Sequence, residues 1–135
     1  MKAGAEAIPR PFPLQPAACH AGSMPRLSIR IDFDKGSLGP GKAHLLELVA
    51  STGSIRKAAA GMKMSYRKAW LLLKSLEETF GAPLVATSTG GRAGGGARLT
   101  PLGTLVAARY RNMEALTAKA VSMDLLALAR KAKKM

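Results

Sequence analysis

The chain has 135 residues, which is enough for one domain with tails at its ends. Lysine and arginine total 21 against 8 acidic residues, a formal net charge of +13, so we expect a polyanionic partner, nucleic acid before an anionic membrane surface. The single cysteine, Cys19, excludes an internal disulfide and a zinc site built on cysteine pairs. Because no apolar run could span a membrane and no secretory signal is visible, we expect a cytoplasmic protein.

The first 25 residues are rich in proline, alanine and glycine without any period, and they predict a disordered tail. Translation could begin at Met1 or at Met24. From residue 26 to residue 33 apolar and polar side chains alternate, which is typical of a half-buried strand. The apolar members are Leu27, Ile29, Ile31 and Phe33. Glycines at positions 36, 39 and 41 then break the chain.

Three helices are expected between residues 40 and 80. The first begins near Pro40, carries an apolar stripe of leucine and valine, and ends before Gly53. The second is short, runs to residue 60, and begins at Ser54, a good N-capping residue. Ser65 caps the third helix, which runs towards residue 80. Alanines at positions 58–60 keep the second helix slim, so the third can cross close to it.

A hairpin and a long helix follow. Residues 83–88 read as a strand, residues 89–96 as a glycine-rich turn, and residues 97–99 as the returning strand. Thr100 caps the long helix, with Pro101 at its first position. Its apolar stripe reaches residue 120 and exceeds what one small domain needs, so we expect this helix to join two copies in a homodimer.

Two short helices joined by a tight turn, followed by a hairpin with a basic, glycine-rich tip, predict a winged helix-turn-helix DNA-binding domain over residues 26–122. The fold class is mainly α, with a small β wing and a long C-terminal dimerisation helix. In such a domain the third helix places its N-terminal end in a major groove of DNA. Residues 123–135 are predicted to form a basic C-terminal tail.

Cationic and hydrogen-bonding side chains gather on the elements that such a domain presents to DNA. Arg67 can grip a guanine edge through two hydrogen bonds, whereas Tyr66 can touch a thymine methyl or a phosphate, or merely support the turn. The other helix cations suit phosphates, and the wing arginines suit a minor groove or the backbone. The predicted DNA-binding residues are Ser54, Arg56, Lys57, Ser65, Tyr66, Arg67, Lys68, Lys74, Arg92 and Arg98.

Some of these residues also fit a purely structural role that involves no contact with DNA. Arg67 and Lys68 also fit an ordinary solvated helix face. Trp70 fits helix packing better than DNA contact, and its role stays open. The glycine cluster is not a phosphate loop, because no Gly-Lys-Ser/Thr sequence follows it. Since no nucleophile–base set, paired carboxylates or ligand cluster is visible, we predict a protein that is not an enzyme and has no cofactor or metal site.

Two motifs occur together in this chain. Residues 53–55, 58–59 and 64–70 read Gly-Ser-Ile, Ala-Ala and Met-Ser-Tyr-Arg-Lys-Ala-Trp, and residues 89–100 read Thr-Gly-Gly-Arg-Ala-Gly-Gly-Gly-Ala-Arg-Leu-Thr. The pair resembles the DNA-binding domain of the molybdate-responsive repressors, the ModE family, and is similar to the N-terminal domain of LysR-type regulators. The resemblance covers residues 26–122. It implies a dimeric winged helix on a palindromic operator, with Ser65, Tyr66 and Arg67 in the groove and Arg92 and Arg98 on the wing.

Full-length members of that family also carry a C-terminal molybdate-binding domain. This chain ends at Met135 and has no Ser-Ala-Arg-Asn type oxyanion motif, so we do not expect it to bind molybdate directly. The leading hypothesis is a sequence-specific regulator whose targets are molybdate transport or cofactor genes. The alternative is a winged-helix module that coats DNA without sequence preference or docks a protein, and sequence preference in DNA binding discriminates the two.

Overall fold

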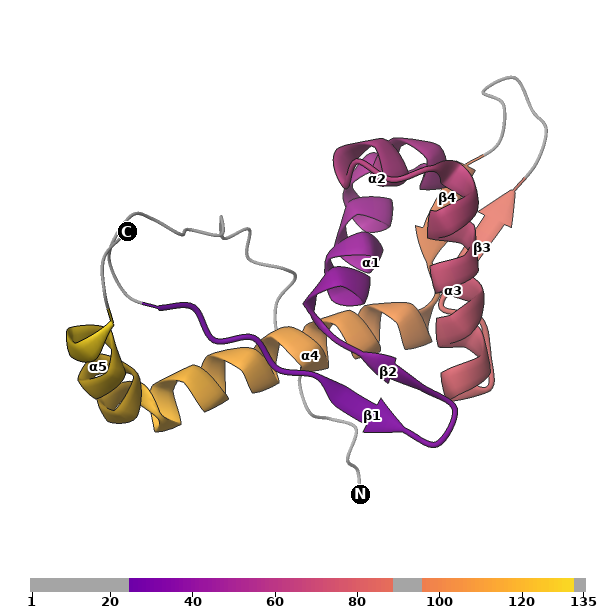
Figure 1. Cartoon of the computed structure of the whole chain (residues 1–135). Coiled ribbons are helices and arrows are strands. Elements are labelled where there is room, and N and C mark those ends of the chain that lie inside the picture. Colours follow the sequence, from indigo (N-terminus) through magenta and orange to yellow (C-terminus); the bar gives the residue numbers. More distant parts are fainter. Residues whose placement is uncertain (1–24, 89–95, 133–135) are drawn as a thin grey trace.

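Helices dominate the computed structural model, which describes residues 25–88 and 96–132 (Figure 1). Its order is β1 (Ile31–Phe33), β2 (Gly36–Leu38), α1 (Pro40–Thr52), α2 (Ile55–Gly61), α3 (Tyr66–Phe80), β3 (Val85–Ser88), β4 (Gly96–Leu99), α4 (Pro101–Ala120) and α5 (Ser122–Lys131). Strands β1 and β2 form one antiparallel pair, and β3 and β4 form another. The predicted fold class, a winged helix-turn-helix with a long helix near its C-terminal end, is confirmed. No helix in the described ranges is long and apolar enough to cross a membrane.

The core lies between α1, α2, α3 and the first half of α4. The apolar stripe expected on α1 supplies Leu45, Leu46 and Val49, which are fully buried. Of the three alanines of α2, Ala58 and Ala59 are buried and Ala60 is exposed, and a Cβ at Gly61 would lie 3.3 Å from a methyl of Leu48 on α1. Such small side chains let the helices approach one another closely.

The helix ends follow the capping rules that the sequence suggested. The hydroxyl oxygens of Ser54, Ser65 and Thr100 each accept a backbone N–H bond of 3.0 Å in the first turn of α2, α3 and α4, respectively. Gly53 and Gly81 end α1 and α3 with φ values of 73° and 78°, in the left-handed region that glycine adopts without strain.

The N-terminal strand prediction was wrong in extent. Only Ile31–Phe33 of the expected segment is strand, and the glycine stretch read as a break contains its partner, Gly36–Leu38. The register joins Ile31 to Leu38, so the pairing is limited to the three residues available before α1 begins. Residues 25–30 have no strand partner, although the carbonyl oxygen of Ile29 accepts a 2.7 Å bond from the Tyr110 hydroxyl.

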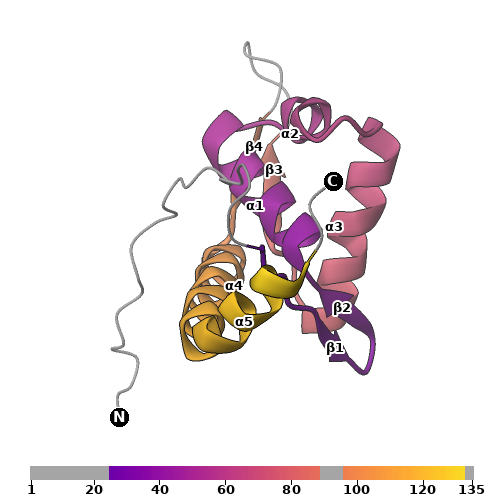
Figure 2. The same ribbon diagram turned by 60° about the vertical axis from the view of Figure 1, so that its left-hand side comes forward.

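Helix α4 leaves the core halfway along its length. Val106, Ala107 and Tyr110 are buried against the body, whereas Met113 and Leu116 are 37% and 59% exposed. Beyond it the chain turns into α5, which follows at the far end of α4 (Figures 1 and 2). The segment expected to be a tail is therefore helical over Ser122–Lys131, because residues 122–131 supply good helix formers and contain no glycine or proline.

Candidate nucleic-acid interface

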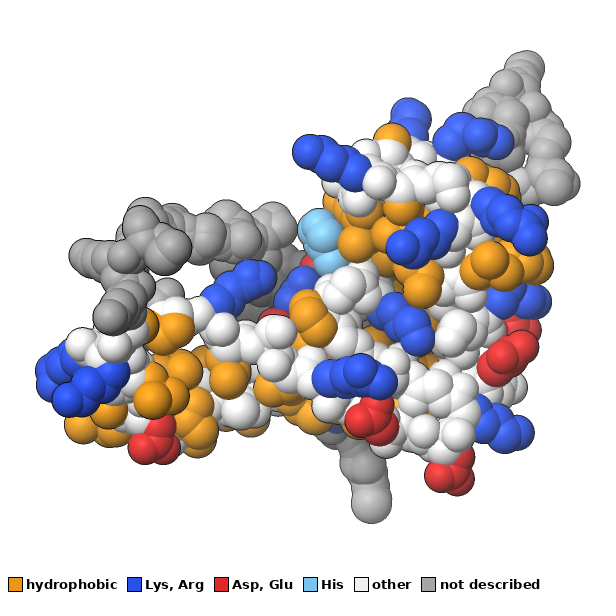
Figure 3. Space-filling view, viewed as in Figure 1, with side chains coloured by type: hydrophobic (Ala, Val, Ile, Leu, Met, Phe, Trp, Pro, Cys, Tyr) orange, Lys and Arg blue, Asp and Glu red, His pale blue; other side chains and the backbone are white. Residues whose placement is uncertain are grey.

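Three elements meet at one end of the molecule: α2, the N-terminal end of α3, and the β3–β4 hairpin (Figure 1). Lysine and arginine side chains surround this end in the space-filling view, and the acidic side chains of that view lie away from it (Figure 3). The sequence explains the separation, since residues 48–76 contain six lysines and arginines and no aspartate or glutamate. A cationic surface of this kind attracts the phosphates of nucleic acid.

The first turn of α3 presents its side chains to solvent. Tyr66, Arg67 and Lys68 are exposed, and so is Ser65, whose hydroxyl oxygen caps the helix by accepting from the Lys68 backbone N–H. Ser65 thus has a structural task that shapes the helix end, while Arg67 and Lys68 keep their charged groups free of any ion pair with a described residue closer than 4.0 Å. The helix end and its two cations form the centre of the candidate surface.

Helix α2 contributes to the same surface through Arg56. Its guanidinium lies 4.9 Å from the ring centre of Tyr66, which is 42% exposed. This cation–π contact links α2 to the start of α3 and orients the phenol ring. Lys57 is exposed beside Arg56, whereas Ser54 is half-buried and uses its hydroxyl oxygen to cap α2. The structure therefore brings Arg56 of α2 against Tyr66 at the start of α3.

The turn between α2 and α3 holds Lys63 at φ 57°, and among the described residues it alone combines a side chain with a positive φ. The left-handed region costs a non-glycine residue roughly 1–2 kcal/mol. Its exposed side chain adds a further cation next to the start of α3. Sequence inspection gave no signal of this strained backbone.

Lys74 and Trp70 lie further along α3, on the side facing β3. The Lys74 ammonium is 5.4 Å from the Trp70 ring centre and 3.3 Å from a Glu77 carboxylate oxygen. Trp70 is 43% exposed and lines a shallow groove of about 170 Å³ with Leu84 and Val85 of the hairpin side, so it lies at the edge of the packing rather than in the core. The predicted phosphate contact of Lys74 would compete with Glu77.

The hairpin is attached to the helix-turn-helix by backbone contacts. The Ala97 N–H donates a 2.9 Å hydrogen bond to the carbonyl oxygen of Gly53, in the turn between α1 and α2. A Cβ at Gly96 would lie 3.4 Å from the same oxygen. Arg98 is exposed on β4, opposite Ala86, and the predicted wing residue Arg92 lies outside the described residues.

The described residues include no cluster of three or more His, Cys, Asp or Glu side chains that could hold a metal ion. His44 Nδ1 lies 3.7 Å from a Glu47 carboxylate oxygen, one turn along α1.

Comparisons with known proteins agree with this geometry. Residues 42–104 match the model of the family described as bacterial regulatory helix-turn-helix protein, lysR family. The match spans α1, α2, α3, the hairpin and the first turn of α4. The resemblance to LysR-type regulators that the motifs suggested is confirmed.

Similar proteins carry names from molybdenum biology. The chain is 40% identical over 85 residues to the molybdenum-pterin-binding protein MopB of Rhodobacter capsulatus, covering 63% of this chain and 32% of that protein. It is 43% identical over 70 residues to the molybdenum transport protein ModE of Herbaspirillum seropedicae, covering 52% and 26%. The DNA-binding transcriptional dual regulator ModE of Escherichia coli K12 is 33% identical over 81 residues, covering 60% and 31%. The chain thus matches about a quarter to a third of the length of these relatives, and the predicted ModE resemblance is confirmed.

Proposed function

We propose that this chain is a DNA-binding transcriptional regulator that reads an inverted repeat as a homodimer in the bacterial cytoplasm. The observation that carries the proposal is the exposed, capped start of α3, which presents Arg67 and Lys68 to solvent and contacts Arg56 of α2 through Tyr66. The family match and the ModE relatives support a regulator, and they favour a binding protein over an enzyme.

In the expected mechanism, some residues recognise base edges and others bind the DNA backbone. The N-terminal end of α3 enters a major groove, where the Arg67 guanidinium donates two hydrogen bonds to a guanine and Tyr66 contacts a thymine methyl or a phosphate. Arg56 and Lys57 bind phosphates at the groove edge, as does Ser54 through its polar groups, while Ser65 stays in the groove beside Tyr66 and Arg67. Arg98, together with Arg92, meets the adjacent backbone or minor groove.

The homodimer is proposed from the apolar face of α4 and α5. Figure 3 shows hydrophobic side chains gathered along these helices at the lower left. The large exposed members are Leu105, Met113, Leu116, Met123 and Leu128. An exposed apolar patch of this kind marks an interaction site, and a second copy would bury it about a twofold axis that matches a palindromic operator.

A substitution in this face tests the dimer. Leu116→Asp is expected to give a monomer in sedimentation at micromolar concentration, because it places a charge in the apolar seam. The matched control is Ser51→Asp, which adds the same charge at an exposed polar position of α1, outside the apolar face of α4 and α5. A dimer that survives Leu116→Asp, or that is lost equally in both variants, would refute this interface.

The sequence preference of DNA binding is tested by selecting genomic fragments that bind the protein at fixed, near-physiological salt. The wild-type protein should enrich a short inverted repeat next to molybdate transport or cofactor genes. Arg67→Ala should lose about 1–3 kcal/mol of discrimination at one base pair of each half-site. The control Lys35→Ala removes an equal charge from the exposed β1–β2 turn at the other end of α3, and it should retain the selected sequence. Equal binding to all fragments would instead indicate a DNA-coating or docking module.

A further inference from the structure

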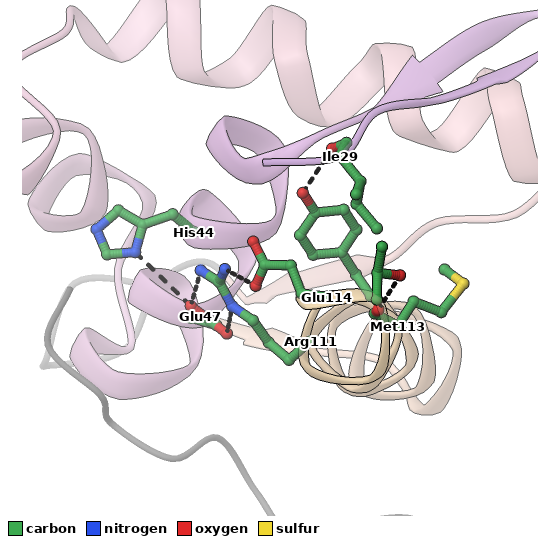
Figure 4. Close-up of polar contacts among 8 residues, drawn as sticks. Ile29, His44, Glu47, Arg111, Met113 and Glu114 are labelled. Atoms are coloured by element: carbon green, nitrogen blue, oxygen red, sulfur yellow. Dashed lines mark hydrogen bonds and ion pairs between the residues drawn. The ribbon is translucent and has the colours of Figure 1, made fainter. Parts of the chain in front are cut away.

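One ion-pair cluster joins α4 to α1, far from the cationic end. Arg111 of α4 donates from Nε to Glu47 Oε2 at 2.7 Å and from Nη2 to Glu47 Oε1 at 2.9 Å. Its Nη1 donates to Oε1 of Glu114, one turn along α4, at 2.7 Å. Figure 4 shows the guanidinium between the two carboxylates. The two parallel bonds to Glu47 form a fork that fixes direction as well as distance.

The cluster lies where α4 leaves the body. Tyr110 is the last buried residue of α4, and Met113 and Leu116 beyond it are exposed. The helix α5 that follows has no buried residue. The Arg111–Glu47 fork is therefore the outermost polar link found between the described parts of α4 and the body of the domain, which it reaches through α1.

The fork is well placed to stay formed. Side-chain exposure is 28% for Arg111, 16% for Glu47 and 21% for Glu114, so water competes only partly for these groups. Hydrogen bonding to Glu47 raises the pKa of Arg111 above its already high ordinary value. The guanidinium is planar and delocalised, and a lysine could not reproduce the two parallel bonds.

We propose that the Arg111–Glu47 fork sets the angle between the DNA-binding body and the α4–α5 arm, and thereby fixes the spacing of the two half-sites that the protein accepts. This inference rests on the proposed function, because it needs two copies on one inverted repeat. It makes Arg111 and Glu47 positioning residues for operator choice, although neither touches DNA.

The part of α4 beyond Arg111 is long enough for a small tilt to change the half-site spacing. Ala120, at the end of α4, lies nine positions after Arg111, which corresponds to about 14 Å of helix. A tilt of about 15° at the fork would move that end by roughly 3.6 Å, close to the rise of about 3.4 Å per base pair in DNA. Loosening the fork should therefore let the dimer accept half-sites that are one base pair closer or further apart.

Two variants separate the link between helices from the link within α4. Glu47→Gln breaks the fork to α1, whereas Glu114→Gln removes an equal charge from the same arginine but only within α4. Affinity is measured for a single half-site and for inverted repeats of the selected spacing, one base pair shorter and one longer. Arg111→Lys, which keeps the charge but not the fork, is measured alongside should Glu47→Gln fold poorly.

The wild-type protein and Glu114→Gln should prefer one spacing by about tenfold or more, a discrimination typical of one wrong base pair. Glu47→Gln and Arg111→Lys should lose most of that preference while their single half-site affinity stays within about twofold. Unchanged preference in both, or an equal loss in Glu114→Gln, would overturn the inference. If the wild-type protein selects no inverted repeat, the proposed function fails first, and that result is visible before any variant is measured.

Discussion

Replacing Gly103 by alanine tests how α4 is joined to the hairpin. Gly103 is buried in the first turn of α4, where a Cβ would overlap the carbonyl oxygen of Leu84 and lie 3.0 Å from its carbonyl carbon. These atoms cannot easily retreat, because the Thr100 N–H donates to the same Leu84 oxygen at 2.9 Å and the Thr100 hydroxyl donates to Pro83 at 2.9 Å. The close approach therefore requires glycine.

Two effects of the substitution oppose each other. Alanine favours a helix interior over glycine by about 1 kcal/mol, and less in a first turn. Overpacking against backbone that is held by hydrogen bonds costs up to about 3 kcal/mol. We expect a net loss of about 2 kcal/mol in the free energy of unfolding, which lowers the melting temperature of a domain of this size by roughly 10 °C.

Thermal unfolding followed by circular dichroism measures the effect. Gly41→Ala is the matched control, since Gly41 is exposed in the first turn of α1 and a Cβ there would have no neighbour within 4 Å. That variant should melt at or slightly above the wild-type temperature, because only the helix preference acts. If Gly103→Ala were as stable as Gly41→Ala, the close approach of α4 to Leu84 would be wrong.

Two further substitutions follow from strained and buried groups. Lys63→Gly should raise the free energy of unfolding by about 0.5 kcal/mol, because glycine adopts the left-handed backbone without strain, and a loss of stability in urea titration would contradict this. The same variant should reduce the slope of log binding constant against log salt concentration by about one, because it removes one cation that binds phosphate. Tyr110→Phe should cost about 1 kcal/mol because the carbonyl of Ile29 loses its partner. Burial raises the pKa of Tyr110 above its ordinary value of 10.0, so the unfolded chain releases the phenol proton first and stability falls as pH rises past that value. Urea titrations at pH 9 and pH 11 should show a smaller fall for Tyr110→Phe, and equal falls would refute the assignment.

The parts of the fold that the sequence predicted well are those decided within a few residues. A capping serine or threonine bonds to a backbone N–H three positions later, so Ser54, Ser65 and Thr100 mark helix starts whatever the rest of the chain does. The α1 and α3 stripes likewise depend only on helical period. The exposed cations at the start of α3 followed from these two rules, since the buried face leaves them on the other side.

The parts that were missed depend on partners distant in the chain. The strand β2 is only three residues long and contains a glycine, and it is held by pairing with β1 and by α3, where Thr79 donates to the carbonyl of Lys35. Nothing local distinguishes such a segment from a loop. The Arg111–Glu47 fork joins residues 64 positions apart, and an arginine in a basic helix gives no sign of which carboxylate it meets.

The hairpin is attached to the rest of the domain by backbone contacts at small residues. The carbonyl of Gly53 holds one end of the hairpin through Ala97, and the glycine at position 103 lets α4 close on Leu84 at the other. The cations around Arg67 are exposed and take no part in the buried core. Substituting them should therefore alter DNA binding while leaving the fold intact, whereas a methyl group at Gly103 should disturb the spacing between helix and wing and so affect every DNA sequence alike.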